Sequence, residues 1–193
     1  MQTTIIKNYT SSLLLVSILL LASILRFYHV SNNPIMLDEA YSEWFAALSY
    51  KEHWTSATEF GIHPVLYYSV LKFWTSLFGD GHIALRSFST FVSILTLPFV
   101  YIFGKNIGGE KMGTKIGLLS TFLVAISPFQ IEWSQIARPY SMMTLGITMA
   151  SAGFSWYLRH NNTKHYDRSH MHPRWLADVC IIIGGSLSLW SHN

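Results

Sequence analysis

The sequence predicts an all-α, polytopic membrane protein, with about five transmembrane helices and two interfacial helices in a long first outer loop. Half of the residues are hydrophobic and only 12% are charged, whereas a soluble domain carries about 25% charged residues. The apolar residues gather in long blocks and not in short alternations. Basic residues cluster between the later blocks, as they do in cytoplasmic loops. We therefore expect a single transmembrane module over residues 1–193, without a soluble domain.

The apolar blocks cover residues 11–28, 64–78, 84–104, 116–130, 141–158 and 175–190. A helix needs roughly 20 apolar residues to cross the hydrocarbon core. The first block is expected to be a retained span, because Arg26-Phe27-Tyr28-His29 follows it instead of a small-residue cleavage site. Block 64–78 is short, begins after His63 and carries Lys72, so we expect it to lie along the outer surface as an interfacial helix.

The distribution of basic residues supports this topology. With block 64–78 on the surface, the basic residues of the later loops join Lys7 on the inner side, namely Lys105, Lys111, Lys115, Arg159, Lys164, Arg168 and Arg174. The positive-inside rule favours this arrangement over one in which the block spans. The first outer loop then covers about residues 29–83, with interfacial helices near 39–50 and 64–78. Cytoplasmic loops lie near 105–115 and 159–174, and a second outer loop lies near 131–140.

Helix breakers agree with these boundaries. Pro128 is expected to end the third span at Ser127, because the residue before proline disfavours helix. Pro139 suits the first turn of the fourth span. The pair Gly108-Gly109 is expected to form the cytoplasmic turn. Each breaker thus falls between two predicted elements.

Ionisable and hydroxyl side chains gather on the predicted outer face, and each could contact a substrate. They are Asp38, Glu39, His63, Tyr67, Arg86, Glu132, Arg138, Tyr140 and His192. Carboxylates can act as a general base toward a hydroxyl acceptor, arginines offer a planar fork for phosphate, and apolar walls suit a lipid tail. A sugar on a polyprenyl phosphate combines these chemical groups. We find no phosphate-binding glycine loop and no DxD motif, and nothing indicates a nucleic-acid partner.

Structural roles compete with these functional ones. Asp38 could cap a helix that starts at Glu39, and Glu39 could be a favourable first-turn acid. Arg86 could extend to lipid headgroups, and Arg138 could pair with Glu132 at the surface. The tyrosines could belong to an interfacial aromatic belt. A divalent cation also stays open as a cofactor, because Asp38, Glu39 and His63 could form a hard-cation site.

The chain resembles the N-terminal module of GT-C glycosyltransferases over roughly residues 10–193. The resemblance rests on the order of Leu37-Asp38-Glu39-Ala40, His63-Pro64-Val65-Leu66-Tyr67-Tyr68, Ala84-Leu85-Arg86-Ser87, Ser127-Pro128 and Gln135-Ile136-Ala137-Arg138-Pro139-Tyr140. The subgroup to which it is most similar comprises bacterial lipopolysaccharide glycosyltransferases with a dolichyl-phosphate-mannose-protein mannosyltransferase-like domain. Val65 stands where that family often has a second proline.

This resemblance implies an inverting sugar transfer from a polyprenyl-phosphate donor to a hydroxyl of a glycan, lipid or protein, on the outer face of a bacterial plasma membrane. It implies that Asp38 is the catalytic base beside Glu39, and that His63, Arg86 and Arg138 contact substrate. Family members are usually longer, so it also implies a truncated product, a fragment or one part of a split enzyme. An inactive fragment and a transporter or flippase are the alternatives. Transport is disfavoured because the ionisable residues lie near span ends and not at the midplane.

Overall fold

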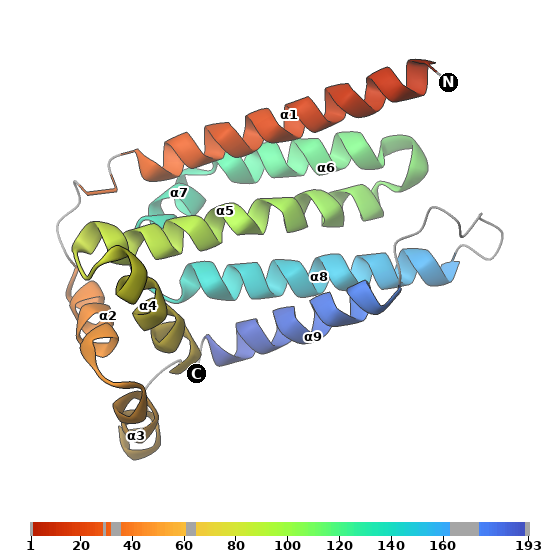
Figure 1. The fold of residues 1–193 in the computed structure, drawn as a ribbon. Helices are drawn as coiled ribbons and strands as arrows, with labels where there is room; N and C mark the ends of the chain where they lie inside the picture. The colour runs from red at the N-terminus through yellow and green to blue at the C-terminus, as the bar shows by residue number, and fades with distance from the viewer. Residues whose placement is uncertain (1, 29, 32–35, 61–64, 163–173, 192–193) are drawn as a thin grey trace.

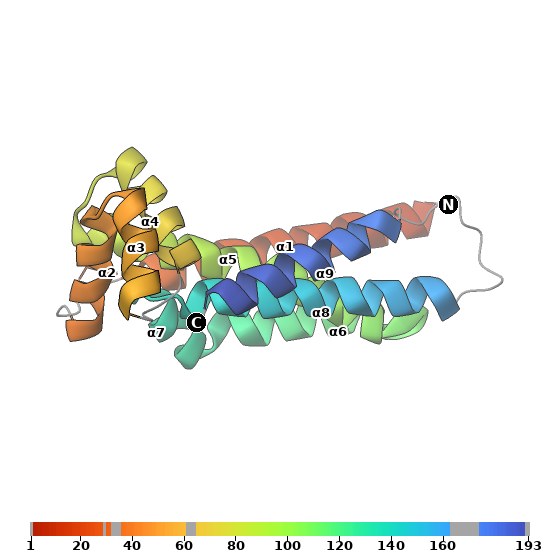
Figure 2. The ribbon, with the colours of Figure 1, turned by 90° about the horizontal axis from the view of Figure 1, so that it is seen from below.

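The computed structural model describes residues 2–28, 30–31, 36–60, 65–162 and 174–191, and every regular element within these ranges is an α-helix. In chain order the helices are α1 (Gln2–Phe27), α2 (Leu37–Ala47), α3 (Tyr50–Phe60), α4 (Val65–Phe78), α5 (His82–Ile107), α6 (Gly109–Ile126), α7 (Pro128–Ser134), α8 (Tyr140–Asn162) and α9 (Arg174–Trp190). The helices α1, α5, α6, α8 and α9 run side by side in a bundle, and α2, α3 and α4 lie together at one end of it (Figures 1 and 2). We call these three helices the cap. The predicted all-α class is confirmed.

Some helices of the bundle have the length and hydropathy of membrane spans. Within the described residues, α1 over Tyr9–Phe27 and α5 over its whole length are long and apolar enough to cross a membrane. The pair α6 and α7 qualifies when taken as one span bent by 60°. Two or three candidate spans are therefore supported by length and composition, and the predicted total of about five stays a prediction.

Glycines allow the bundle helices to approach closely. A Cβ added to Gly104 of α5 would lie 3.0 Å from the backbone of Gly117 in α6. A Cβ added to Gly146 of α8 would lie 2.6 Å from the carbonyl oxygen of Gly184 in α9. Small residues at such crossings are typical of membrane helix pairs, which associate by close packing because lipid supplies no hydrophobic driving force between them.

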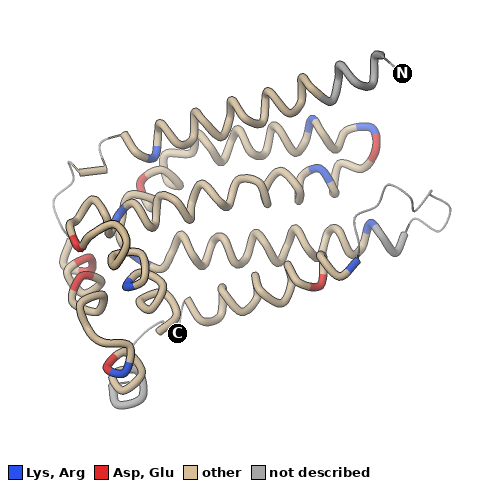
Figure 3. The backbone as a smooth tube through the Cα atoms, viewed as in Figure 1, with Lys and Arg blue, Asp and Glu red and all other residues tan. Residues whose placement is uncertain are grey.

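Helices α5 and α6 are joined by the predicted Gly108-Gly109 turn. Gly109 has a φ of +64°, in the left-handed region that glycine adopts readily. Figure 3 shows charged residues at both ends of the bundle, with few along the middle of its helices. This turn therefore lies among the charges at the end opposite the cap.

The cap is bound to the bundle by an aromatic core. Phe45 of α2 stacks on Tyr68 of α4 with ring centroids 4.5 Å apart, and Tyr67 packs against Phe88 of α5. These four side chains are buried. The expected interfacial helices near 39–50 and 64–78 correspond to α2 and α4. Because α4 has only 14 residues and belongs to the cap, the prediction that block 64–78 does not span agrees with the fold.

Helix α3 was not predicted, although a local signal for it exists. Ser49 and Glu52 form a capping box: the Ser49 hydroxyl accepts a hydrogen bond from Glu52 N (3.3 Å), and the Glu52 carboxylate accepts one from Ser49 N (2.7 Å). This reciprocal pair satisfies backbone donors at a helix start. The search for apolar blocks missed it because α3 is mostly polar.

A break between α6 and α7 shapes the cap end of the bundle. As predicted, α6 ends before Ser127-Pro128. Proline cannot donate to the carbonyl four residues earlier, which leaves Val124 O without its helical partner. The fully buried Arg26 side chain of α1 donates to Val124 O (3.1 Å) and to Ala125 O (2.9 Å). A buried arginine thus stabilises the break.

Candidate active site

The loop of residues 135–139 carries Arg138 and is held by hydrogen bonds from several helices. Gln135 donates through Nε2 to the carbonyls of Arg26 (3.0 Å) and Tyr28 (2.7 Å). Thr90 of α5 donates to Ser134 O (3.0 Å), just before the loop. Since residues 134–137 are all buried, this segment is a fixed support for the side chain of Arg138.

Glu39 and Arg86 form a buried ion pair beside this loop. Arg86 donates through Nε to Glu39 Oε1 (2.8 Å) and through Nη2 to Glu39 Oε2 (2.7 Å). The same carboxylate accepts a bond from Ala137 N (3.0 Å) at Oε1 and from Met36 N (3.3 Å) at Oε2. Arg86 also donates to Val30 O (3.0 Å). The pair therefore joins the cap, α5 and the loop.

This environment stabilises the ionised form of Glu39. Burial by itself would raise its pKa, but the hydrogen bonds from Arg86, Ala137 N and Met36 N outweigh burial, and the pKa is lowered. Each carboxylate oxygen already accepts one bond from Arg86 and one from a backbone N–H, so its acceptor positions are filled. Glu39 is poorly suited to accept a proton from a substrate or to bind a cation. The geometry favours a structural role for Glu39 and Arg86.

Asp38 is in a different environment, although it is the next residue along the chain. Its side chain is 61% exposed, and Oδ2 lies 3.7 Å from Arg138 Nη2. Helix α2 begins at Leu37 with Met36 as its N-cap, so the expectation that Asp38 caps a helix starting at Glu39 is wrong. Glu39 reaches back to Met36 N instead, as an acid in the first turn of the helix. The Asp38 carboxylate is therefore accessible and not needed as a cap.

The guanidinium of Arg138 contacts protein through Nη1 and Nη2, whereas its Nε has no hydrogen-bond partner among the described residues. Nη1 donates weakly to Asp38 O (3.4 Å), and the guanidinium lies 5.9 Å from the ring centroid of Tyr140. This Nε is buried. Burial lowers the pKa of Arg138, but Tyr68, Tyr140 and Asp38 outweigh it and the pKa is raised. Arg138 pairs with Asp38 and not with Glu132, which corrects the expected surface pair.

Buried hydroxyl groups lie near Arg138. Tyr67 is 0% exposed and Tyr68 is 3% exposed, and burial raises the pKa of both phenols. Ser42 of α2 is also fully buried. The hydroxyl oxygens of Ser42 and Tyr67 have no hydrogen-bond partner in the described part of the chain. Inside the protein, Ser89 lies beside Tyr67 and the Tyr68 phenol lies beside Ser42.

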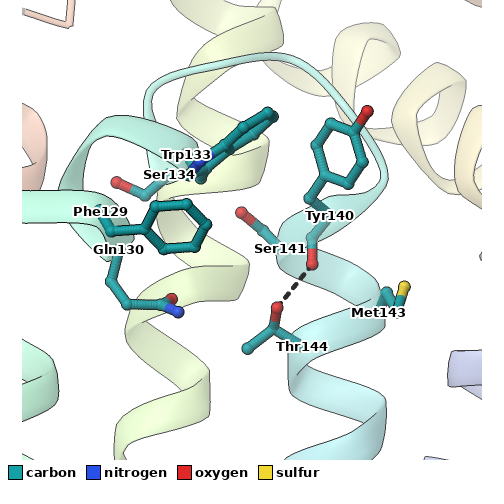
Figure 4. A pocket seen from close by; sticks show the side chains of 8 residues that line it. All are labelled: Phe129, Gln130, Trp133, Ser134, Tyr140, Ser141, Met143 and Thr144. Atoms are coloured by element: carbon teal, nitrogen blue, oxygen red, sulfur yellow. Dashed lines mark hydrogen bonds between the residues drawn. The ribbon is translucent and has the colours of Figure 1, made fainter.

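A cavity of about 310 Å³ lies next to this group, between α7 and α8. Figure 4 shows Phe129, Gln130 and Trp133 of α7 facing Ser141 and Thr144 of α8 across the hollow. Tyr140 lines the same cavity and makes an edge-to-face contact with Trp133 at 4.6 Å. Tyr140 therefore borders the cavity and also lies 5.9 Å from the Arg138 guanidinium, although Asp38 and Arg138 do not line the cavity.

Of the remaining predicted site residues, only Glu132 lies in the described part of the chain, and it does not join this group. Glu132 is exposed on α7, and no described side chain forms an ion pair with it. His63 and His192 lie outside the described residues. The hard-cation site of Asp38, Glu39 and His63 is poorly matched by the described part, because Arg86 places a fixed positive charge on Glu39.

Ser42, Arg26 and the cavity residues of α7 were missed from sequence. A serine in an amphipathic helix carries no functional signal. Arg26 was considered only as a flank of the first span. The cavity forms because the chain bends between α6 and α7. Pro128 in the sequence indicates that a bend occurs, but it does not indicate the direction in which α7 turns.

Comparison with known proteins identifies a family. The family model described as dolichyl-phosphate-mannose-protein mannosyltransferase matches residues 62–170, which is more than half of the chain. The matched region contains His63, Tyr67, Arg86, Glu132, Arg138 and Tyr140, and it begins after Asp38 and Glu39. No curated protein and no solved structure matches significantly.

Proposed function

Because the chain belongs to the dolichyl-phosphate-mannose-protein mannosyltransferase family, we propose that it transfers a sugar from a polyprenyl-phosphate donor to a hydroxyl acceptor. The family and the apolar bundle support a membrane glycosyltransferase of the GT-C type. The donor, the inverting stereochemistry and an outward-facing site in a bacterial plasma membrane are proposals. Acceptors carrying a hydroxyl include glycans, lipids and proteins.

The observation that carries the proposal is the loose contact between Asp38 and Arg138. An accessible carboxylate and a guanidinium with an unpartnered Nε lie 3.7 Å apart at the cap end of the bundle. A contact of this length at a partly exposed site contributes little stability. Substrate can therefore separate the two groups at small cost.

The roles of the two residues follow from their chemistry. Asp38 accepts the proton of the acceptor hydroxyl as its oxygen attacks the anomeric carbon. The bond from that carbon to the phosphate oxygen breaks, and the polyprenyl phosphate leaves with the electron pair. Arg138 stabilises the negative charge that develops on the phosphate. A single displacement of this kind inverts the anomeric configuration.

The cavity beside Tyr140 supports the proposal, because it could receive the lipid part of the donor. Phe129, Trp133 and Tyr140 supply aromatic surface within the reach of a chain whose phosphate contacts Arg138. Clefts that are mostly apolar with a few polar groups are typical of ligand sites. A transporter is supported less well, because Arg26 and Arg86 are engaged in protein contacts near the helix ends.

The experiment supplies the purified protein in proteoliposomes with a polyprenyl-phosphate mannose labelled in the sugar. Release of polyprenyl phosphate measures donor use even when the acceptor is unidentified, and a crude envelope extract supplies acceptors. We expect label to move into the extract with release of lipid phosphate. Equal donor loss in protein-free liposomes, or transfer from a nucleotide sugar instead, would contradict the proposal.

A further inference from the structure

Arg26 is a buried cation near the end of α1, and no acidic side chain in the described ranges forms an ion pair with it. Its guanidinium donates to three uncharged oxygens instead. They are Ser93 Oγ on α5 (3.0 Å) and the carbonyls of Ala125 (2.9 Å) and Val124 (3.1 Å) at the end of α6. Burying a charge is costly unless hydrogen bonds compensate, so these bonds tie α1 to α5 and to the end of α6.

The loop after α7 returns the contact to α1. Gln135 is the C-cap of α7, and its Nε2 donates to Arg26 O (3.0 Å) and Tyr28 O (2.7 Å). The last carbonyls of a helix have no partner within it, and Val30 N already bonds to Phe27 O. The end of α6 is thus satisfied by a side chain of α1, and the end of α1 by the side chain of Gln135.

This exchange of hydrogen bonds holds α7 at both ends. The Arg26 bonds lie just before the Ser127-Pro128 break, and the Gln135 bonds lie just after the last turn of α7. Helix α7 has only seven residues, and a helix this short is not stable on its own. The direction of α7 therefore depends on what holds its two ends.

Arg138 follows Gln135 closely, with little slack between them. Arg138 N donates to Ile136 O (2.8 Å), which closes a tight turn, and residues 134–137 are buried. A shift of Gln135 would therefore be carried to Arg138. The contact of Arg138 with the exposed Asp38 carboxylate is a loose 3.7 Å pair, which does not hold the guanidinium in place by itself.

We propose that Gln135 and Arg26 are positioning residues of the donor site, which hold the loop so that the Arg138 guanidinium meets the donor phosphate. This inference rests on the proposed function, in which Arg138 contacts that phosphate. Both residues act through Arg138 and not on the substrate. The Glu39 carboxylate fixes the loop from the cap side at Ala137 N (3.0 Å), and Gln135 fixes it from the side of α1.

The placement of α7 can be measured without catalysis, by pulsed electron resonance between two spin labels. The labels are attached to single cysteines at the exposed positions 41 on α2 and 132 on α7, in the full chain in detergent with Cys180 replaced by serine. Gln135→Met keeps the approximate size of the side chain but cannot donate to the carbonyls. Asn106→Ala is the matched control, because it removes a hydrogen bond between α5 and α8 at the opposite end of the bundle.

The parent protein should give one narrow distribution of distances between the labels. Gln135→Met should broaden or displace this distribution, and Asn106→Ala should leave it unchanged. Arg26→Lys is the second variant; it keeps the charge but lacks the planar fork that serves several acceptors at once, and it should act as Gln135→Met does. A distribution that neither variant changes would overturn the inference, whether or not the protein is active.

A double-mutant cycle shows whether Gln135 acts through Arg138. In proteoliposomes with labelled polyprenyl-phosphate mannose, Gln135→Met should raise the apparent donor KM by roughly 10-fold, as expected when a bond to a charged group is weakened. In the Arg138→Lys background the same change should add little, because the group that Gln135 positions is already altered. A merely structural role would instead multiply the two effects.

The possible failures are distinguishable. Multiplied effects in the double variant would overturn the inference and leave the proposed function standing. If wild type releases no more polyprenyl phosphate than protein-free liposomes do, the proposed function fails, and the role of Gln135 in donor binding falls with it even where the spin labels show that Gln135 holds α7.

Discussion

Glu39 and Arg86 are joined through two hydrogen bonds, of 2.8 Å and 2.7 Å, and both side chains are buried. This pair fixes the first turn of α2 against α5 and, through Ala137 N, against the loop that carries Arg138. Asp38 precedes Glu39 in the same turn, and its carboxylate stays accessible. The two adjacent acids therefore have different environments: Glu39 holds α2 against α5 and the loop, and Asp38 stays accessible.

Replacing Glu39 with Gln should destabilise the protein strongly. The change leaves Arg86 buried without its counter-ion, and breaking a buried pair in this way costs about 3–5 kcal/mol. Thermal unfolding in detergent, followed by tryptophan fluorescence, measures the loss. Asp38→Asn is the matched control in the same turn and should melt within a few degrees of wild type. Equal melting of Glu39→Gln and wild type would show that the pair is not needed for stability.

The stability of the protein should depend on pH through Glu39. Burial would raise its pKa, but the bonds from Arg86 and two backbone N–H groups bring it below the ordinary value of 4.5. A carboxyl whose pKa is lowered on folding stabilises the protein above its unfolded pKa and loses that contribution as the pH falls through the folded pKa. The melting temperature should therefore be insensitive to Glu39 above about pH 4.5 and should decline below it.

The same acid titration of Glu39→Gln provides the comparison. Above about pH 4.5 the melting temperature of the variant should be lower than that of wild type. Below that pH it should fall less steeply than that of wild type, because the variant has no carboxylate at position 39 to become protonated. Parallel curves for the variant and wild type would show that Glu39 is not responsible for the decline.

Sidedness can be tested with single cysteines in a background in which Cys180 is replaced by serine. Cysteines at the exposed positions 80 and 132, at the cap end, should react with an impermeant thiol reagent added to intact cells. A cysteine at the exposed position 110, in the turn at the opposite end, should react only after the membrane is opened. The reverse pattern would place the cap in the cytoplasm and contradict the positive-inside prediction.

Arg138→Lys should weaken donor binding even though the charge is kept. Lysine lacks the planar fork and has no equivalent of Nε, so a phosphate would lose at least one hydrogen bond. We expect the apparent donor affinity to fall by roughly 10-fold or more. Arg159→Lys, at the opposite end of the bundle, is the control and should behave as wild type. Unchanged donor binding by Arg138→Lys would remove Arg138 from the phosphate site.

Sequence reasoning found the architecture because the apolar blocks and helix breakers are local signals. The boundaries at Gly108 and Pro128 correspond to observed breaks, and block 64–78 was assigned to the surface from the charges of distant loops. The polar helix α3 was not predicted because it contains no apolar block, although the capping box of Ser49 and Glu52 marks its start. The pattern of the sequence thus predicts elements better when they are buried in lipid than when they lie at the surface.

The site was predicted less completely, because side-chain partners are decided by packing. The sequence places Asp38 and Glu39 together and cannot say which of them is buried. Arg86 was expected to meet phosphate or lipid headgroups, but it turns toward Glu39. The partner of Arg138 proved to be Asp38, a hundred residues away in sequence. Such pairings follow from the tertiary arrangement of α2, α5 and the loop.

The most direct test of the account is the rate of sugar release from a labelled polyprenyl-phosphate mannose by the Asp38→Asn variant. Asparagine keeps the size of the side chain but cannot serve as the base, and the structure gives Asp38 no capping role. We predict normal expression and melting, with a transfer rate lower by roughly 10²- to 10⁴-fold, the usual contribution of a positioned general base. A transfer rate near that of wild type would contradict the assignment of Asp38 as the base.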